Sequence, residues 1–287
     1  MLCRHAILHI ALITAAAGPL TAQAGARPPG TGGVSQVEGA GGGGLVPWAL
    51  IAGSGTREQV GATGFATWLD TGNFRLNAAG AALAWQDRVE LSFARQRFDL
   101  GDTVPGQTIA LDTLGLKWRI YGDAIADQDS PWPQLAIGAM YKRNRDFDRV
   151  PAALGARHAS ALEPYVAASK VWIDGLAGYT TVLNGTVRAS RANQFGILGF
   201  GGDRNDRLRL YGEASAALFL TDRLVAGLEW RQKPDNLKAS REQAAFDGFV
   251  AWLPRQHVAV TLAYVQLGNI ADKAKQGGPY VSIMLDW

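Results

Sequence analysis

Apolar and polar residues alternate with a period of two in short runs along most of the chain. The clearest run covers residues 257–266, where Val258, Val260, Leu262 and Tyr264 share one face and more polar or smaller residues occupy the other. This period is that of a β-strand, whose successive side chains point to opposite faces. Strongly amphipathic helices are scarce. The pattern therefore predicts an all-β protein.

Twelve such segments are expected, separated by turn residues. Several are longer than the strands of soluble proteins and reach the roughly 9–11 residues that a tilted strand needs to cross a bilayer. Three of them alternate poorly, namely 60–70, 74–86 and 162–173, where bulges or small residues interrupt the pattern. The segments lie near 60–70, 74–86, 89–100, 109–121, 133–143, 162–173, 178–190, 208–220, 223–233, 246–254, 257–267 and 279–287.

The links between these segments differ in length according to their order. Short links such as 87–88 and 221–222 follow even-numbered segments, whereas long links such as 144–161, 191–207 and 268–278 follow odd-numbered ones; the first and fourth links break the pattern. Outer-membrane barrels have an even number of strands, short periplasmic turns and longer outer loops. We therefore predict an antiparallel transmembrane β-barrel of about 12 strands, with both ends of the barrel sequence on the periplasmic side.

Aromatic residues at the segment ends fit two interfacial girdles of such a barrel. For any single aromatic residue, ordinary core packing is the alternative. With odd-numbered strands running outward, the outer girdle comprises Trp68, Tyr141, Trp230 and Tyr264, and the periplasmic girdle comprises Trp85, Trp252 and Trp287.

The chain ends in "VSIMLDW", whose alternation runs into the last residue. Val281, Ile283, Leu285 and Trp287 are expected to face lipid. An open sheet edge would leave unpaired polar groups in hydrocarbon, so this strand should close the barrel by pairing with residues 60–70.

Residues 1–24 have the features of a secretory signal peptide, with cleavage expected after Ala24. A basic residue, Arg4, precedes an apolar run, and Ala22-Gln23-Ala24 provides a small-residue cleavage site. The only cysteine, Cys3, lies in this segment, so the mature chain is expected to contain no disulfide and no cysteine nucleophile.

The mature chain then divides into a Gly-rich segment, 25–58, and a barrel, 59–287. The Gly-rich segment is expected to be periplasmic or lumenal. It could pack in the lumen, pair at the barrel rim or form an extra strand. We favour a position at the periplasmic end.

Composition and motifs limit the chemistry. The formal net charge is +3 and charged residues make up 18% of the chain, so there is no basic excess that would point to nucleic acid. "GAGGGG" and "GFGGD" lack the strand–helix context of a phosphate-binding loop, and no paired histidines have zinc spacing. His158 lies close to Ser160, the only candidate pair for a lipid hydrolase. His158 and His257, the two histidines of the mature chain, are both better interpreted as solvated or rim residues, and we predict neither enzymatic activity nor a cofactor.

The side chains predicted to face the lumen indicate more about function than these motifs do. Basic rings favour anions in pores, which makes a passive channel for small, anionic solutes the first hypothesis. A salt-bridged, non-conducting barrel that anchors a partner is the alternative. The apolar loop "RANQFGILGFGG" (191–202) is a candidate constriction that folds inward. The candidate pore-lining residues are Lys142, Arg188, Arg209, Glu213, Glu229, Arg231 and Lys233.

Several stretches resemble a proteobacterial family, domain-of-unknown-function family 3034. They are "GGGGLVPWALIAG" (41–53), "DRVELSFARQRFD" (87–99), "NGTVRASRANQFGILGFGGD" (184–203), "EWRQKPDNL" (229–237) and "VTLAYVQLGNIA" (260–271). The resemblance implies a secreted outer-membrane barrel and no particular activity or functional residue. The terminal "VSIMLDW" separately resembles the assembly signal of outer-membrane barrels. Barrel assembly machinery and outer-membrane lipid are therefore the expected partners.

Overall fold

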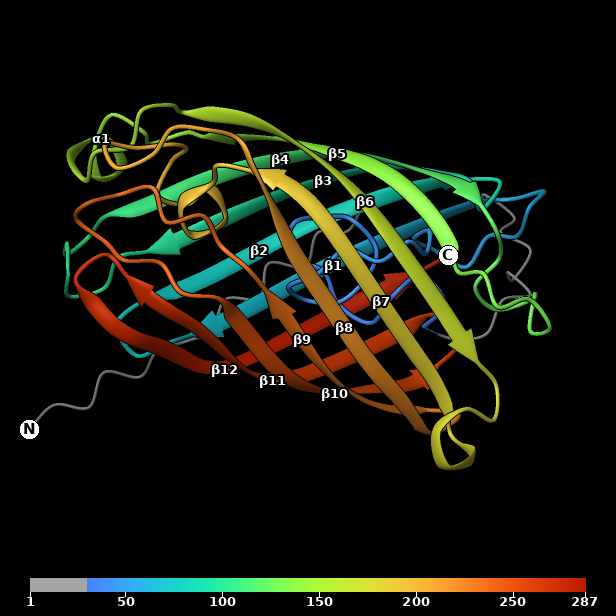
Figure 1. Cartoon of the computed structure of the whole chain (residues 1–287). Coiled ribbons are helices and arrows are strands. Elements are labelled where there is room, and N and C mark those ends of the chain that lie inside the picture. The colour runs from blue at the N-terminus through green and yellow to red at the C-terminus, as the bar shows by residue number, and fades with distance from the viewer. Residues whose placement is uncertain (1–29) are drawn as a thin grey trace, which may run out of the picture.

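The computed structural model describes residues 30–287, which form a closed antiparallel barrel of twelve strands (Figure 1). Each strand pairs with its neighbours in chain order, and all twelve predicted strands are confirmed. Among the described residues, no helix is long and apolar enough to span a membrane. The proposed signal peptide, 1–24, lies outside the described residues. The strands are β1 (Val60–Asp70), β2 (Arg75–Trp85), β3 (Val89–Asp99), β4 (Thr108–Tyr121), β5 (Gln134–Asn144), β6 (Ser160–Trp172), β7 (Thr180–Ser190), β8 (Arg209–Thr221), β9 (Leu224–Arg231), β10 (Ala245–Arg255), β11 (Val258–Ile270) and β12 (Lys273–Asp286).

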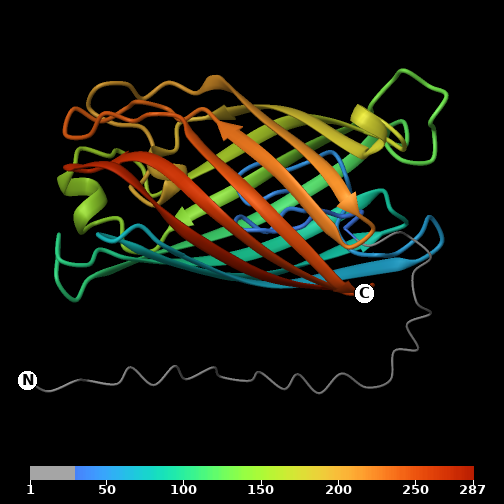
Figure 2. The same ribbon diagram turned by 90° about the horizontal axis from the view of Figure 1, so that it is seen from below.

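Three short helical turns occur in the links between strands: α1 (Val150–Ala153), η1 (Leu176–Gly178) and η2 (Asn193–Gly196). The C-terminus lies at the end of the barrel opposite to α1 (Figure 2). The long links after β5 and β7 therefore gather at one end, which we call the outer end on the basis of the predicted topology. The other end, with the C-terminus, is called the periplasmic end.

The barrel closes between its first and last strands. Pairing of β1 with β12 runs from Thr63 opposite Asp286 to Leu69 opposite Tyr280. Trp287 extends this seam, because its N–H donates to the carbonyl of Ala62 at 2.8 Å and its carbonyl accepts from the N–H of Ala62 at 2.8 Å. The expected closure by the last strand is confirmed, and the twelve strands of the described chain leave no sheet edge open.

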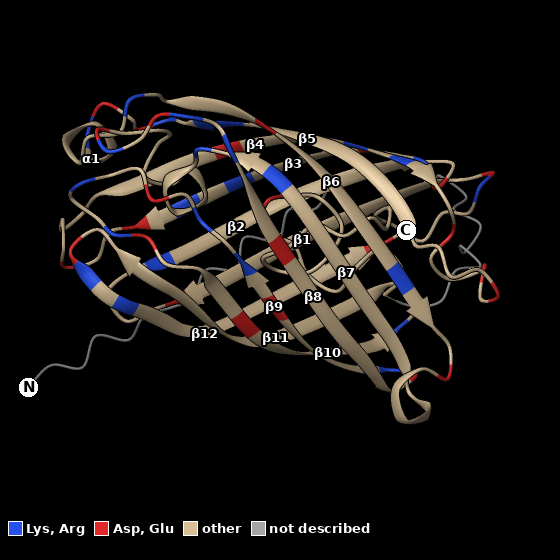
Figure 3. Ribbon diagram, in the orientation of Figure 1, with Lys and Arg blue, Asp and Glu red and all other residues tan. Residues whose placement is uncertain are grey.

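The two faces of the sheet have the expected characters. Along β12, Ile283 and Leu285 point outward and are exposed, whereas Ser282 and Met284 are buried inside. Large apolar side chains cover the outward face of the other strands in the same way, and many charged residues lie in the links at the two ends (Figure 3). Because a closed sheet with an apolar exterior satisfies its backbone groups internally, this is a barrel of the outer-membrane type.

One predicted loop is wrong. Residues 268–278 belong mostly to β11 and β12, which continue as a hairpin around Ala271–Asp272. Gly268, Ala271 and Lys275 adopt positive φ angles of 71°, 50° and 54°, and the register shifts near Gly268. The Gly- and Lys-rich composition resembles a loop, yet bulges allow these residues to remain paired.

The N-terminal segment lies inside the barrel, where its blue trace is visible between the strands (Figures 1 and 2). Nearly all side chains from Thr31 to Ser54 are buried, and exposure returns at Arg57 and Glu58. We call residues 30–55 the plug. The lumenal position, one of those left open for this segment, is therefore the observed one, and only the entry of the plug lies at the favoured periplasmic end. The lumen can hold it because inward-facing polar side chains satisfy its peptide groups.

Close approach explains the glycine content of the plug. A Cβ atom at Gly33 would lie 2.3 Å from the carbonyl oxygen of Gly42, and one at Gly43 would lie 1.9 Å from Glu229 Oε1. Gly33 also has a φ of 120°, which residues with a side chain rarely adopt. The sequence "GAGGGG" therefore allows a tight hairpin, in which Gly42 pairs with Pro47, to fit between the barrel walls.

Candidate functional site in the barrel lumen

Uncharged side chains from several strands hold the backbone of the plug. The N–H of Ala49 donates to Ser169 Oγ at 2.8 Å, while Gln134 Nε2 donates to the carbonyl of Ala49 at 2.7 Å. Thr186 Oγ1 donates to the carbonyl of Pro47 at 2.8 Å. These contacts come from β5, β6 and β7, so the plug is bound as a specific structure and does not simply occupy space.

Six charged groups form a buried cluster in the outer half of the lumen, which we call the lumenal charge cluster. Three are cationic and three are anionic, so their formal charges cancel. Glu38 is the only member from the plug. The members are Glu38, Lys142, Glu163, Arg188, Glu213 and Arg231.

Glu38 connects the plug to three strands at once. It pairs with Lys142 of β5, and its Oε2 lies 3.2 Å from Arg188 Nη1 of β7 and 2.9 Å from Arg231 Nη1 of β9. Burial would raise the pKa of Glu38, but Arg231, Lys142 and Arg188 together lower that pKa well below its usual range. Glu38 therefore remains ionised inside the protein.

The other two carboxylates of the cluster come from the wall. Glu163 Oε2 lies 2.6 Å from Lys142 Nζ, and Glu213 Oε1 lies 2.6 Å from Arg188 Nε and 3.3 Å from Arg231 Nε. Two wall carboxylates thus face three wall cations. Glu38 of the plug supplies the third negative charge, so the formal charges of the cluster cancel only when the plug is bound.

A second buried ion pair holds the plug nearer its middle. Lys117 Nζ lies 3.0 Å from Glu90 Oε2, and both side chains are only 1% exposed. Lys117 also donates to the carbonyls of Gly41 and Leu50 at 3.0 and 2.8 Å, while Glu90 accepts from the N–H of Ala52 at 2.8 Å. This pair is not among the candidate residues predicted from the sequence, although both residues occupy the polar, inward face of predicted strands.

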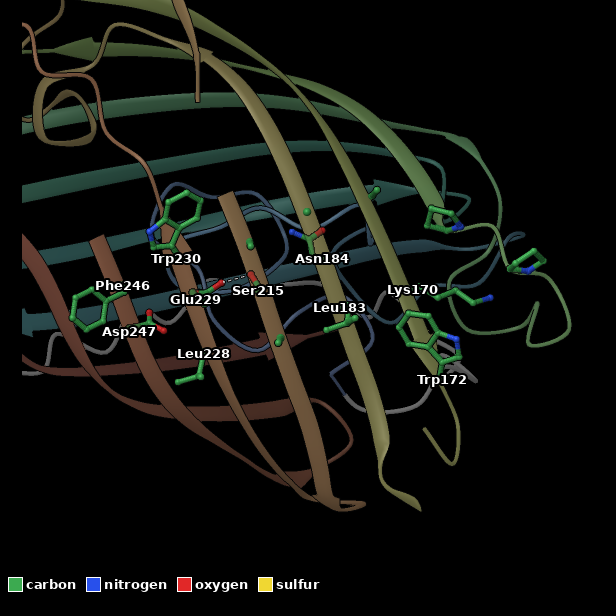
Figure 4. A pocket seen from close by; sticks show the side chains of 16 residues that line it. Lys170, Trp172, Leu183, Asn184, Ser215, Leu228, Glu229, Trp230, Phe246 and Asp247 are labelled. Atoms are coloured by element: carbon green, nitrogen blue, oxygen red, sulfur yellow. Dashed lines mark hydrogen bonds between the residues drawn. The ribbon is translucent and has the colours of Figure 1, made fainter. Parts of the chain in front are cut away.

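Glu229 binds the tip of the plug hairpin. It accepts hydrogen bonds from the N–H of Leu45 at 2.8 Å and from Ser215 Oγ at 2.9 Å, the latter drawn in Figure 4. Asp247 lies opposite Glu229 on the neighbouring strand β10. Trp48 Nε1 donates to Ser215 Oγ at 3.0 Å, which fixes the far side of the hairpin. The tip is therefore held by side chains of β8 and β9.

The wall around Glu229 also has a hollow on its outward surface, of about 780 Å³. Small residues, Ala168, Gly185, Ala214 and Ala216, are among those that line it. Figure 4 shows Leu228 and Trp230 flanking Glu229 on the same strand. Both are exposed, whereas Glu229 is buried, so neighbouring residues of one strand serve the outward surface and the lumen.

The loop 191–202 covers the outer end of the plug, and we call it the lid. It folds inward, as the sequence hypothesis proposed. The Phe195 ring packs 4.4 Å from the guanidinium of Arg231, and the Phe195 carbonyl accepts from Lys142 Nζ at 3.2 Å. Plug and lid therefore contact the same two wall cations, Lys142 and Arg231.

A separate ion pair fastens the lid to the loop after β9. Lys233 Nζ lies 2.7 Å from Glu242 Oε2 and 2.6 Å from Gln194 Oε1 of the lid. The N–H of Gln194 in turn donates to Glu242 Oε1 at 3.0 Å. Burial raises the pKa of Glu242, although Lys233 opposes this shift.

Six of the seven candidate pore-lining residues lie in the lumen and are at most 8% exposed. They contact the plug, the lid or one another. Arg209 differs from the expectation: it begins β8 at the outer rim, beyond the plug and lid, and its side chain is exposed. The six buried residues are Lys142, Arg188, Glu213, Glu229, Arg231 and Lys233.

The structure places all seven girdle candidates on the outward surface with exposed side chains. Their contact with the two membrane interfaces stays a prediction. The seven are Trp68, Trp85, Tyr141, Trp230, Trp252, Tyr264 and Trp287.

The candidate hydrolase pair is not assembled. His158 Nε2 lies 3.0 Å from Asp206 Oδ1, and within residues 30–287 no hydrogen bond joins His158 to Ser160. Arg157 and Arg191 also approach Asp206, at 3.7 and 3.6 Å. No group of three His, Cys, Asp or Glu side chains in the described part of the chain has a geometry that would hold a metal ion.

Comparisons with solved structures find outer-membrane proteins of similar architecture. The NanC porin is 8% identical, with a TM-score of 0.46, and the match covers 80% of this chain and 99% of the porin. Omp33 of Acinetobacter baumannii is 10% identical, with a TM-score of 0.41 and coverages of 80% and 97%. LpxR of Salmonella typhimurium is 12% identical, with a TM-score of 0.43 and coverages of 80% and 99%.

A search of curated protein sequences finds no match. A family model described as "Protein of unknown function (DUF3034)" matches residues 31–284, which include the plug and the barrel from β1 nearly to the end of β12. The chain therefore belongs to the DUF3034 family.

Proposed function

We propose that this protein is an outer-membrane barrel whose resting state does not conduct solutes, and that it acts as a membrane anchor for partners bound at its outer loops. The observation that carries the closed resting state is the position of Glu38 between Lys142, Arg188 and Arg231, and anchoring is the role that the sequence hypothesis gives to a non-conducting barrel. An open pore would leave these cations in contact with water. Here they are buried, and Glu38 of the N-terminal segment supplies the third of the three negative charges that balance them.

Electrostatics support a plug that stays in place. If the plug left, three cations of the lumenal charge cluster would face only two carboxylates, Glu163 and Glu213. The Lys117–Glu90 pair would also lose its contacts with the backbone of Gly41, Leu50 and Ala52. The plugged lumen is therefore the favoured state.

Single-channel recording in planar bilayers tests this proposal. Refolded protein, with folding checked by heat-modifiable migration on gels, should give no discrete conductance steps. A variant that lacks residues 30–55 should give steps if it forms the barrel. Steps from the intact protein of the same size as those from the deletion variant would contradict a closed resting state.

A second candidate function is a gated channel for small anions, in which the plug or its tip must move before solutes pass. The excess of wall cations over wall carboxylates in the lumenal charge cluster favours it, because basic rings favour anions in pores. The reversal potential of the plug-deletion variant in a potassium chloride gradient tests this idea. Preference for chloride would support it, and preference for potassium would contradict it.

A further inference from the structure

Four arginines surround one aspartate on the outward surface of β3, β4 and β5, at the outer end of these strands. The strand register places Arg95, Asp112 and Arg143 in one row across the sheet. In the next row, Arg97 lies opposite Ala110, whose carbonyl accepts from the N–H of Arg145 at 2.8 Å. We call these four arginines the arginine array.

The array has more positive charge than the protein neutralises. Arg95 forms two hydrogen bonds with Asp112, at 2.6 and 2.8 Å, and Arg145 Nε lies 3.7 Å from the same carboxylate. Arg97 and Arg143 are exposed and form no ion pair with any residue of the described chain. The array thus holds four guanidinium groups and one carboxylate, and only Arg95 and Arg145 pair with that carboxylate.

Neighbouring carboxylates are already engaged by backbone groups. Asp99 Oδ1 accepts from the N–H of Gly101 at 2.9 Å, and Asp146 Oδ2 accepts from the N–H of Ala110 at 2.9 Å. Asp146 also lies near Arg149, at 3.8 Å. These groups hold the loops beyond the array and do not pair with Arg97 or Arg143, so both guanidinium groups are available to bind an external anion.

The array lies directly beyond an apolar surface. The row of the same three strands next to Arg95 and Arg143 consists of Phe93, Leu114 and Tyr141, all exposed. The following row continues with Leu91 and Leu116, also exposed. Along the direction of the strands, the outward surface of β3, β4 and β5 thus changes from apolar to strongly basic between one row of side chains and the next.

We propose that the arginine array binds the phosphate groups of a phosphorylated lipid headgroup in the outer leaflet. Guanidinium groups stay charged under all relevant conditions and bind phosphate oxygens in a bidentate manner. A lipid satisfies both parts of this surface, because its acyl chains can lie on the apolar rows while its phosphates meet the array. A soluble anion or an acidic protein would leave the apolar rows without a partner. The placement of this end of the barrel at the outer leaflet rests on the predicted barrel topology.

Lipid titration of the refolded protein in detergent micelles, followed by native mass spectrometry, tests the proposal. The probe is bisphosphorylated lipid A, compared with the same lipid after removal of its phosphates. The variant Arg97→Gln/Arg143→Gln removes the two unpaired cations. The matched control, Arg223→Gln/Arg255→Gln, removes the same charge from exposed positions at the periplasmic end. All four positions are exposed, so both variants should fold, as heat-modifiable migration can verify.

We expect the array variant to bind bisphosphorylated lipid A about tenfold or more weakly, because each lost guanidinium removes charge-assisted hydrogen bonds. The control should bind as the unmodified protein does, and dephosphorylated lipid should bind both equally weakly. Unchanged affinity of the array variant would overturn the proposal, as would an equal loss in the control. Displacement of the lipid by inorganic phosphate at comparable concentration would show a site for soluble anions and would overturn the assignment to lipid.

Discussion

Replacing Glu38 by glutamine should loosen the plug. The change keeps the size of the side chain but removes its charge, so the lumenal charge cluster retains three cations and two carboxylates. Glu58→Gln is the matched control, because Glu58 belongs to the same N-terminal stretch but is exposed. The control should behave like the unmodified protein.

The size of the effect follows from the contacts of Glu38. It lies 2.9 Å from Arg231 Nη1 and 3.2 Å from Arg188 Nη1, and it also pairs with Lys142. Removing one partner of a buried ion pair costs about 3–5 kcal/mol, and glutamine retains some hydrogen bonding, so we take about 3 kcal/mol. That figure corresponds to a roughly hundredfold larger population of unplugged barrels.

Thiol labelling measures this population. Cys3 is the only cysteine of the chain and lies in the expected signal peptide, so refolded protein that starts after it carries no thiol. Ala49→Cys places a sulfur in the plug at a position with 0% exposure. A maleimide should label this thiol slowly when Glu38 is present and about a hundredfold faster in the Glu38→Gln background. Equal labelling rates in both backgrounds would refute the reasoning.

The pH dependence gives a second check on Glu38. Its pKa in the closed state is lowered below the usual value of 4.5, chiefly by Arg231 among the neighbouring cations and against the effect of burial. The stabilisation is therefore fully present above pH 4.5 and is lost only as pH falls through the lowered pKa. Conductance should stay absent when pH is reduced from 7 to about 4.5. Opening near pH 4.5 would show that the neighbouring cations do not hold Glu38 ionised.

Two further changes test the packing of the plug and the seam. Gly43→Ala would place a Cβ 1.9 Å from Glu229 Oε1 and should lower the free energy of unfolding by about 1–3 kcal/mol, whereas Gly185→Ala, with nothing within 4 Å, should change it by less than about 0.5 kcal/mol. Urea titration compares the two, and equal midpoints would contradict the tight fit. Deleting Trp287 removes two backbone hydrogen bonds at the seam and one to Ser54 of the plug, and it should reduce the amount of heat-modifiable barrel in the outer-membrane fraction. Normal levels there would contradict a role in assembly.

The sequence was sufficient for the barrel because each strand carries its own signal. Alternation places Ser282, Met284 and Asp286 inside and Ile283 and Leu285 outside, and this pattern is local to the strand. The parity of link lengths and the terminal position of Trp287 then determined the closure. The hairpin of residues 268–278 was missed because bulged pairing at Gly268 leaves no regular alternation.

The plug could not be placed from the sequence because its contacts are remote in the chain and follow no period. Glu38 and Arg231 are separated by 193 residues, and the Gly-rich stretch between 39 and 44 belongs to no strand. The alternation of side chains along each strand did place Lys142, Arg188 and Arg231 on the inward face. Whether such residues line water or bind a counter-charge depends on Glu38, whose isolated position in a Gly-rich segment resembles that of a solvated residue.

The plug is covalently joined to β1 by the few residues from Thr56 to Gln59, and the carbonyl of Trp287 accepts from the N–H of Ser54 at 3.2 Å where the plug enters the lumen. A plug on so short a tether stays at an effective concentration near its site on the order of millimolar, whatever the amount of protein in the membrane. Any ligand that takes its place must compete with this local concentration, so displacement would be brief unless the ligand is abundant or binds tightly. Cleavage of the peptide bond between the exposed residues Arg57 and Glu58 would remove this high local concentration, because a freed plug would dilute into the periplasm.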